Sequence, residues 1–252
     1  MFLKWGSQPW MIWRSHWRNR QMLGGRRVTF AILTAMGLFA AIPYTLINRF
    51  ASIRDWAAFD PTLQLDIDIP FLAWMILPYM TLYLYYPVAA WLGSKNEIMW
   101  RQNIVFHQMM LLTCWGVNLI FILLPVEIDL RHLIHGIEGT MWEPFYASMH
   151  AIDTPWNSWP SLHIVQSMQV VFVLRSWYPP TTSRLRIAHV LLLIMWIMLV
   201  ISTMTIKQHY VWDVATAMLV AGLTWVYWMK PCLERLKTEE FIDQFDARMA
   251  LD

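Results

Sequence analysis

Long apolar runs separated by shorter polar segments dominate this chain. One helix that crosses a bilayer core of ~30 Å needs about 20 consecutive, mostly apolar residues. Runs of this kind occupy residues 28–46, 70–92, 104–124, 161–177, 187–205 and 209–228. The fourth run is the shortest and contains Gln166 and Ser167, so we expect other helices, rather than lipid, to surround it. The pattern predicts an all-α integral membrane protein with a six-transmembrane-helix bundle.

Composition supports the membrane class and excludes several others. The 252 residues are 58% hydrophobic and 14% charged, whereas soluble domains average ~45–50% and ~25%. The 17 Trp, 18 Met and 12 Phe residues exclude a disordered chain. A net charge of +2 is too small to indicate a nucleic-acid partner. Two cysteines are too few to define the fold by disulfides.

The positions of lysine and arginine predict the orientation of the helices, because these residues are retained in cytoplasmic loops. With the N-terminus in the cytoplasm, all but four of the 19 lysine and arginine residues fall in cytoplasmic segments. The four on the other side are Arg49, Arg54, Arg131 and Lys207. An odd number of spans removes this contrast, so we expect six spans and two cytoplasmic termini.

Three parts of the chain follow from this topology. Residues 1–27 form a Trp- and Arg-bearing amphipathic segment, expected on the inner membrane surface. Residues 28–230 form the membrane domain, and residues 231–252 form a cytoplasmic tail. Between the third and fourth spans, residues 125–160 predict an extracytoplasmic loop subdomain with a short interfacial helix around 138–150.

Ionisable residues at the edges of these spans are the candidates for chemistry, because such residues are costly in a membrane. His163 lies at the start of the fourth span, and Lys207, His209 and Asp213 lie around the start of the sixth. His209 and Asp213 are four residues apart, so on a helix the carboxylate reaches the imidazole and fixes its tautomer. This pairing favours His209 as a nucleophile.

The same end of the bundle is suited to an anion. Pro160 and Ser161 indicate a helix start, with Asn157 or Ser158 as the expected cap. The N-terminus of this helix and that of the sixth span attract negative charge. Lys207 and Arg131 add cations on the same side. Donors that converge in this way suit phosphoryl transfer, in which one histidine attacks phosphorus and another protonates the leaving oxygen.

Other interpretations of these residues remain open. His209 and Asp213 also suit a structural hydrogen-bonded pair. Lys207 also suits a side chain that extends toward lipid head groups, and Arg131 also suits an ion pair with Glu127, four residues earlier.

The remaining histidines are interpreted as structural or solvent-exposed residues. His107 and His189 are expected to pack within apolar helices. His132 and His135 indicate a solvated turn rather than a metal site, because no cysteine or third histidine lies nearby.

Two motifs resemble those of a known family. Pro160-Ser-Leu-His163 and Lys207-Gln-His209-Tyr-Val-Trp-Asp213 are similar to the second and third signatures of the type 2 phosphatidic acid phosphatase superfamily, Pro-Ser-x-His and Ser-Arg-x5-His-x3-Asp. Ser202 lies seven residues before His209, as in the third signature, but Thr203 occupies the position of its arginine.

The details of the motifs resemble one branch of that superfamily. Lys207-Gln-His209, and Asn157 before Pro-Ser-Leu-His, are similar to the inositol phosphorylceramide synthase-like branch. The first signature, Lys-x6-Arg-Pro, is degraded here, because Leu124 stands at its lysine and His132 follows Arg131, the candidate for its arginine.

The resemblance implies a division of roles. His209 forms a phosphohistidine, Asp213 orients it, and His163 is the general acid. The residues that hold the phosphate are Ser161, Lys207 and Arg131. No metal or cofactor is implied. The implied activity is hydrolysis of a phosphomonoester or diphosphate of a lipid at the extracytoplasmic face. The alternative is a phosphotransferase that moves a phospho-head group between lipids or to an alcohol.

Two hypotheses from other classes are also considered. A haem-binding electron carrier would use imidazoles from different spans as axial ligands, with His107, His163 and His209 as candidates. A lipid-binding or transport protein would bind a phosphate head group at the same residues without turnover. The oligomeric state is not determined by the sequence.

Overall fold

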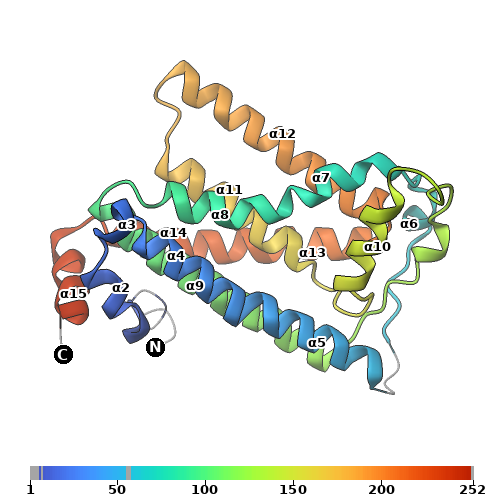
Figure 1. Ribbon diagram of the computed structural model, residues 1–252, viewed down its shortest axis with the longest axis horizontal. Coiled ribbons are helices and arrows are strands. Elements are labelled where there is room, and N and C mark those ends of the chain that lie inside the picture. Colours follow the sequence, from blue (N-terminus) through green and yellow to red (C-terminus); the bar gives the residue numbers. More distant parts are fainter. Residues whose placement is uncertain (1–5, 7, 55–57, 251–252) are drawn as a thin grey trace.

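The structure is a computed structural model and describes residues 6, 8–54 and 58–250. Helices dominate this part of the chain, and the extended segments within it pair only at single positions, Val126 with Phe59 and with Asn157. The main helices are α4 (Arg27–Met36), α5 (Ile42–Ile53), α7 (Ile76–Met80), α8 (Leu82–Leu92), α9 (Glu97–Leu123), α11 (Leu162–Trp177), α12 (Ser183–Thr205), α13 (Val211–Thr224) and α14 (Lys230–Arg235). Most run lengthwise through an elongated bundle (Figure 1).

Four continuous helices in the described residues are long and apolar enough to cross a membrane. They are Arg27–Ile53, Glu97–Leu123, Ser183–Thr205 and Val211–Arg235. The first joins α4 to α5 through a π-helical turn, η2 (Gly37–Ala41), and the last joins α13 to α14 through a second such turn, η5 (Trp225–Met229). These helices make the chain a membrane protein and match four of the six predicted spans.

The other two predicted spans are shorter helices. The run 70–92 divides into η3 (Ala73–Met75), α7 and α8, with a turn at Thr81 between the last two. Pro78 and Pro87 lie within this run and cannot donate backbone hydrogen bonds. The run 161–177 forms α11, of 16 residues. A bundle of six spans therefore stays a prediction.

Helix α9 forms the centre of the bundle. In its apolar window 72% of the residues are buried, against 28% for the other three long helices. Its polar residues are also buried, as expected for a membrane helix that is surrounded by other helices rather than by lipid; they include Gln102, Asn103, His107, Gln108 and Asn118. Helix α11 packs against α8, α9, α12 and α13, and its Gln166 and Ser167 are buried, as expected for the fourth run.

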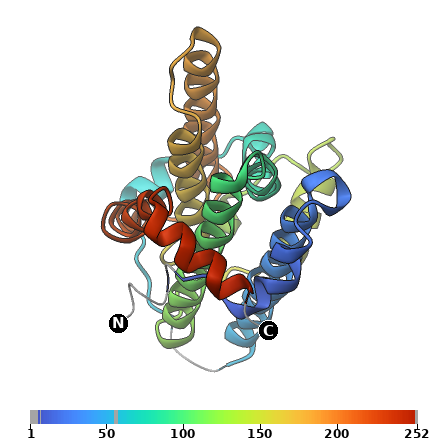
Figure 2. The ribbon, with the colours of Figure 1, turned by 90° about the vertical axis from the view of Figure 1, so that its left-hand side faces the viewer.

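Helices near the two ends of the chain pack together at one end of the bundle. Helix α15 (Glu239–Ala250) contacts α2 (Arg14–Arg18), as seen in Figure 2, which faces this end. Arg101 of α9 forms an ion pair with Asp246, at 2.6 Å. Buried Gln108 of α9 accepts hydrogen bonds from the backbone of Trp10 and the indole of Trp13. The N-terminal segment thus packs into the bundle, and its position on a membrane surface stays a prediction.

The opposite end carries the long connections. Helix α6 (Gln64–Asp68) precedes α7, while η4 (Arg131–Leu133) and α10 (Glu143–Ile152) lie between α9 and α11 (Figure 1). Helix α10 begins five residues later than the short helix expected around 138–150. Its buried Tyr146 and Met149 pack with Ile76 and Tyr79 of α7. An extracytoplasmic subdomain at this end stays a prediction.

Candidate active site

Two imidazoles from separate segments are in direct contact. His163 lies in the first turn of α11, and His209 lies in the connection between α12 and α13. The Nδ1 atom of His163 is 3.0 Å from the Nε2 atom of His209. The two histidines are 46 residues apart in sequence, and the packing of α11 against α13 brings them together.

Asp213 holds the other nitrogen of His209. Its Oδ2 lies 3.2 Å from Nδ1 of His209 and also accepts the backbone N–H of Tyr210, at 3.0 Å. Asp213 is fully buried. The predicted contact between the two side chains is confirmed, but α13 begins at Val211, so His209 lies just before the helix. The carboxylate therefore serves both the helix start and the imidazole.

Ser161 stands at the start of α11 with its hydroxyl available. Helix α11 begins at Leu162, and the buried Oγ of Ser161 has no hydrogen-bond partner among the described residues. The backbone N–H of Ser161 donates to the carbonyl of Asp213, at 3.3 Å.

The expected caps of this helix are wrong. The amide of Asn157 donates to the carbonyl of Tyr44, and the hydroxyl of Ser158 donates to the carbonyl of Val126. Both side chains tie the preceding loop to other segments instead, because that loop packs between them.

Arg131 reaches the site from η4. Its guanidinium donates to the carbonyl of Asp153 at 2.7 Å and to the side chain of Gln208 at 3.2 Å, rather than to Glu127. Within the described part of the chain its buried Nε has no partner. Burial lowers the pKa of Arg131, although nearby Asp153 opposes this shift. The side chain thus lies beside the segment that carries His209, and its Nε donor has no partner in the described residues.

His150 of α10 is a further polar residue beside Arg131 and Gln208. Its Nε2 is 3.2 Å from the amide nitrogen of Gln208, so a neutral imidazole accepts the bond. Burial, assisted by the charge of Arg131, lowers the pKa of His150 from 6.5 to about 4. Neither His150 nor Gln208 was singled out by sequence reasoning, because neither belongs to a motif with a role of its own.

Lys207 points toward the loop before α7. Its ammonium donates to the carbonyls of Asp66 at 2.7 Å and Ile69 at 2.6 Å, and the residue has a φ of 60°. The Asp66 carboxylate accepts the N–H of Val211, at 2.6 Å. Burial lowers the pKa of Lys207, while Asp66 opposes this. Lys207 and Asp66 together fasten α6 to the segment that carries His209.

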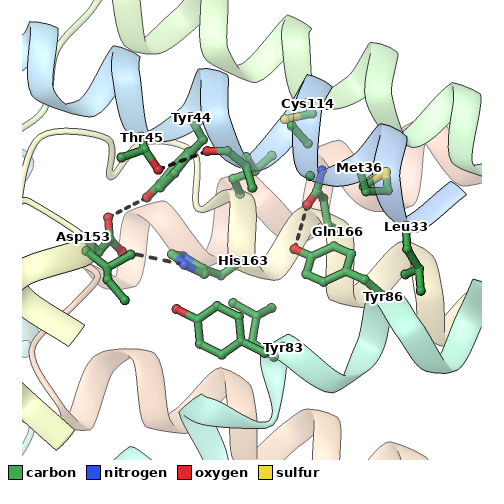
Figure 3. Close-up of a pocket in the computed structure, with 16 residues that line it drawn as sticks. Leu33, Met36, Tyr44, Thr45, Tyr83, Tyr86, Cys114, Asp153, His163 and Gln166 are labelled. Carbon is green, nitrogen blue, oxygen red and sulfur yellow. Dashed lines mark hydrogen bonds and ion pairs between the residues drawn. The ribbon is translucent and has the colours of Figure 1, made fainter. Parts of the chain in front are cut away.

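Asp153 is a site residue that sequence reasoning missed. Its Oδ2 lies 3.7 Å from Nε2 of His163, and both side chains are nearly buried, at 13% and 12% exposed. Its Oδ1 accepts a hydrogen bond from the hydroxyl of Tyr44 at 2.8 Å (Figure 3). The same Oδ1 accepts a hydrogen bond from the amide of Asn48 at 2.9 Å. The hydroxyl of Tyr79 lies 3.4 Å from the same Nε2. No local spacing marks Asp153, because a loop, not a helix turn, joins it to His163.

A cavity of about 310 Å³ opens beside His163. Helix residues of α4, η2 and α5 line one side, residues of α8 the other, and residues of α11 the base. Asp153 and His163 lie at one end of it (Figure 3). Its lining is mostly apolar, which suits the hydrocarbon part of a ligand.

The geometry bears on the metal and haem hypotheses. Among the described residues, no group of three or more His, Cys, Asp or Glu side chains is placed to hold a metal ion. His132 is 63% exposed beside Asp129, which agrees with a solvated turn. The direct contact of His163 with His209 leaves no room for a porphyrin between these two imidazoles. His107 packs in α9 with Nδ1 on the carbonyl of Asn103.

Comparison with known proteins gives one match. The family model described as the PAP2 superfamily matches residues 130–236. The matched segment runs from η4 through α14 and contains both contacting histidines and Asp213. No curated protein and no solved structure matches the chain.

Proposed function

We propose that this chain hydrolyses a membrane lipid phosphomonoester or diphosphate through a phosphohistidine on His209, because residues 130–236 match the PAP2 superfamily, whose members are phosphatases. One observation carries the proposal. His209 is held at Nδ1 by Asp213, while its Nε2 faces His163. Phosphoryl transfer through a covalent intermediate needs such a nucleophile, with an orienting carboxylate on one side and an acid on the other.

In the site without substrate, the hydrogen bonds form a chain in which each residue donates to the next, from Tyr79 through His163 and His209 to Asp213. Asp213 accepts from Nδ1–H of His209, so the Nε2 of His209 carries a lone pair. That lone pair accepts from Nδ1–H of His163, whose Nε2 accepts from the Tyr79 hydroxyl. These tautomers are assigned from the partners. They keep the attacking lone pair of His209 directed at the place where the substrate enters.

In the first step the phosphate group displaces the hydrogen bond between the two imidazoles, whose nitrogens must separate from their 3.0 Å contact to admit it. The lone pair on Nε2 of His209 forms a bond to phosphorus as the bond from phosphorus to the lipid oxygen breaks. For this step His163 must first take up a proton from solvent on Nε2, which faces Asp153; it then gives its Nδ1 proton to that oxygen, and the lipid alcohol leaves. The carboxylate of Asp153, 3.7 Å from Nε2, stabilises the cation that this step requires.

In the second step water attacks the phosphohistidine. Its oxygen bonds to phosphorus, its proton passes to Nδ1 of His163, and the bond from phosphorus to Nε2 of His209 breaks. Inorganic phosphate leaves, and His163 is again the acid. The same group thus serves as acid and then as base, so no further proton carrier is needed.

The groups that hold the phosphate oxygens are those with unused donors. The Ser161 hydroxyl and Nε of Arg131 are buried without partners in the described chain. Two of the three N–H bonds of the Lys207 ammonium are used on carbonyls, so its contribution to phosphate binding rests on the third. We therefore assign Lys207 chiefly to holding the loop and Ser161 with Arg131 to the anion.

The acceptor and the membrane side complete the proposal. Water is the acceptor that we favour. With an alcohol as acceptor, the same residues would make the protein a phosphotransferase. The sequence Lys207-Gln208-His209 supports this second candidate function. The loops that surround the site carry few lysines and arginines, which supports an extracytoplasmic site.

Replacement of each histidine tests the mechanism. His209→Ala should abolish both lipid phosphate hydrolysis and the acid-labile phosphoenzyme trapped from a labelled substrate, because no intermediate can form. His163→Ala should slow hydrolysis of a lipid phosphate by about 10²–10⁴-fold, the usual contribution of general acid catalysis. Much of its rate should return with nitrophenyl phosphate, whose leaving group needs no proton.

The matched control is His132→Ala, which removes an exposed histidine at the same end of the bundle. It should leave both activities unchanged. A phosphoenzyme that persists in His209→Ala would refute the assignment of the nucleophile. An equal loss on both substrates in His163→Ala would refute its role as the acid.

A further inference from the structure

A second cavity, of about 290 Å³, lies between the N-terminal segment and the first long helix. One wall is formed by residues of η1 (Met11–Trp13) and α2. The other wall follows the long helix from Arg27, at the start of α4, to Phe39 in η2. About 25 Å of continuous helix separate Arg27 from Tyr44, which lines the cavity beside His163. The second cavity is therefore distinct from the histidine site.

The wall on the long helix is an apolar stripe that begins at a charged side chain. Its members are three or four positions apart and so share one face of the helix. They are Arg27, Phe30, Ala31, Thr34, Ala35, Leu38 and Phe39. From Arg27 to Leu38 the stripe is about 16 Å long. Phe30, Leu38 and Phe39 are exposed, so the groove is open to the outside of the bundle, where lipid chains surround a membrane protein.

Arg27 and His16 are the ionisable residues that line this groove, and no Asp or Glu of the described chain is among its lining residues. Within the same residues Arg27 has no hydrogen bond or ion pair: its Nε is buried without a partner, and its Nη atoms are accessible. The Nδ1 of His16 is also buried without a partner there. Burial lowers the pKa of His16, and the nearby charge of Arg27 lowers it further. An uncompensated cation thus lies beside an imidazole at one end of an apolar groove.

The neighbouring arginines differ from Arg27 in having partners. Arg20 forms an ion pair with Glu97 at 3.1 Å, and Arg26 donates to the carbonyl of Trp91 at 2.8 Å. Residues 1–54 contain no Asp or Glu, so the sequence around Arg27 supplies no carboxylate for it. The charge of Arg27 is therefore complementary to an anion from outside the chain.

We infer that this groove binds an anionic phospholipid of the surrounding bilayer, with the phosphate on Arg27 and His16 and one acyl chain along α4. Arg27 begins a helix long enough to span the membrane, so it lies at the level of lipid head groups. A free anion would satisfy the cation but leave the apolar stripe uncovered, whereas a phospholipid covers both. A zwitterionic head group is disfavoured because its own ammonium compensates the phosphate. The inference is independent of the reaction at His209.

Lipid binding to the full chain in a neutral detergent tests the inference. The protein is titrated with phosphatidylglycerol or with phosphatidylcholine of the same acyl chains, and bound lipid is counted by native mass spectrometry. The wild type should bind phosphatidylglycerol about 10-fold more tightly, the effect of one hydrogen bond between charged groups. Arg27→Gln should lose this preference. Glycerophosphoglycerol, the same head group without chains, should compete far less well than the lipid, because it cannot cover the stripe.

Arg26→Gln is the matched control. It removes the same charge at the adjacent position, but the Arg26 guanidinium lies on the ring of Trp91 and does not line the groove. It should keep the preference for phosphatidylglycerol. His16→Glu retains Arg27 and places a carboxylate beside it, so it should also abolish the preference. This second variant gives an answer if Arg27→Gln fails to fold.

Three results would overturn the inference. Equal affinities of the wild type for the two lipids would show that the groove does not select an anionic head group. Equal losses in Arg26→Gln and Arg27→Gln would show that the preference comes from the general positive charge of this end of the bundle. Competition by glycerophosphoglycerol as strong as that by the lipid would indicate a site for a free anion.

Discussion

Replacement of Asp153 by asparagine isolates one charge next to the proposed acid. The substitution keeps the size of the side chain and its Oδ1, so the bonds from Tyr44 and Asn48 are retained. It replaces the charged Oδ2 that faces Nε2 of His163 by a neutral amide nitrogen, so the negative charge at this position is lost. Asp153 does not touch the reacting atoms in our mechanism, so it acts as a positioning residue through His163.

The size of the effect follows from the distance between the two groups. Two unit charges at 3.7 Å interact by about 4 kcal/mol at an effective dielectric constant of about 20. This value is an upper limit, because both side chains retain some contact with solvent. Loss of 3–4 kcal/mol of stabilisation of the imidazolium corresponds to about 10²–10³-fold in rate. We therefore expect Asp153→Asn to lower kcat on a lipid phosphate by that factor.

The assay compares two leaving groups in the same preparation. Phosphate release is measured from a lipid phosphate and from nitrophenyl phosphate over pH 5–8. Asp153→Asn should lose most of its rate on the lipid substrate and little on the aryl substrate, and the alkaline limb of its pH profile on the lipid substrate should move to lower pH. Asp129→Asn is the control, because that carboxylate is 93% exposed at the same end of the bundle.

Two outcomes would refute this reasoning. Equal losses on the lipid and aryl substrates would mean that Asp153 supports the fold or the nucleophile rather than the acid. An unchanged rate on the lipid substrate would mean that the charge at 3.7 Å does not stabilise the imidazolium.

Two further predictions concern topology and pH. Single cysteines at Met141 and Lys95, both exposed positions, in a background that lacks the native cysteines, should differ in labelling by an impermeant thiol reagent added to intact cells. The Met141 position alone should react, and labelling at position 95 alone would reverse the orientation. The pKa of His150 is lowered to about 4, so folding disfavours its protonation, and the stability it contributes should decrease as the pH falls from about 6.5 toward 4. His150→Gln retains an acceptor for Gln208 and should flatten this acid dependence in thermal unfolding; an unchanged pH profile would contradict the assignment.

The sequence by itself determined that this is a membrane protein and predicted the central residues of the proposed site. A membrane-spanning protein can be inferred from the sequence because each apolar run that a bilayer requires is one continuous stretch of the chain. The pairing of His209 with Asp213 is also local, since four residues separate them. The two histidine motifs could be joined in one site because each marks a helix start on the same predicted side.

Tertiary structure decided which groups surround the histidines and what they do. The carbonyls that hold the Lys207 ammonium come from the loop before α7, more than a hundred residues away in sequence. Asp153 reaches His163 only because Tyr44 and Asn48 of α5 fix its carboxylate. Such contacts join segments whose relative positions depend on the packing of the whole bundle. The local sequence pattern does not determine that packing. The contacts of Lys207 with the segment before α7 and the position of Asp153 beside His163 could therefore not be derived from the sequence.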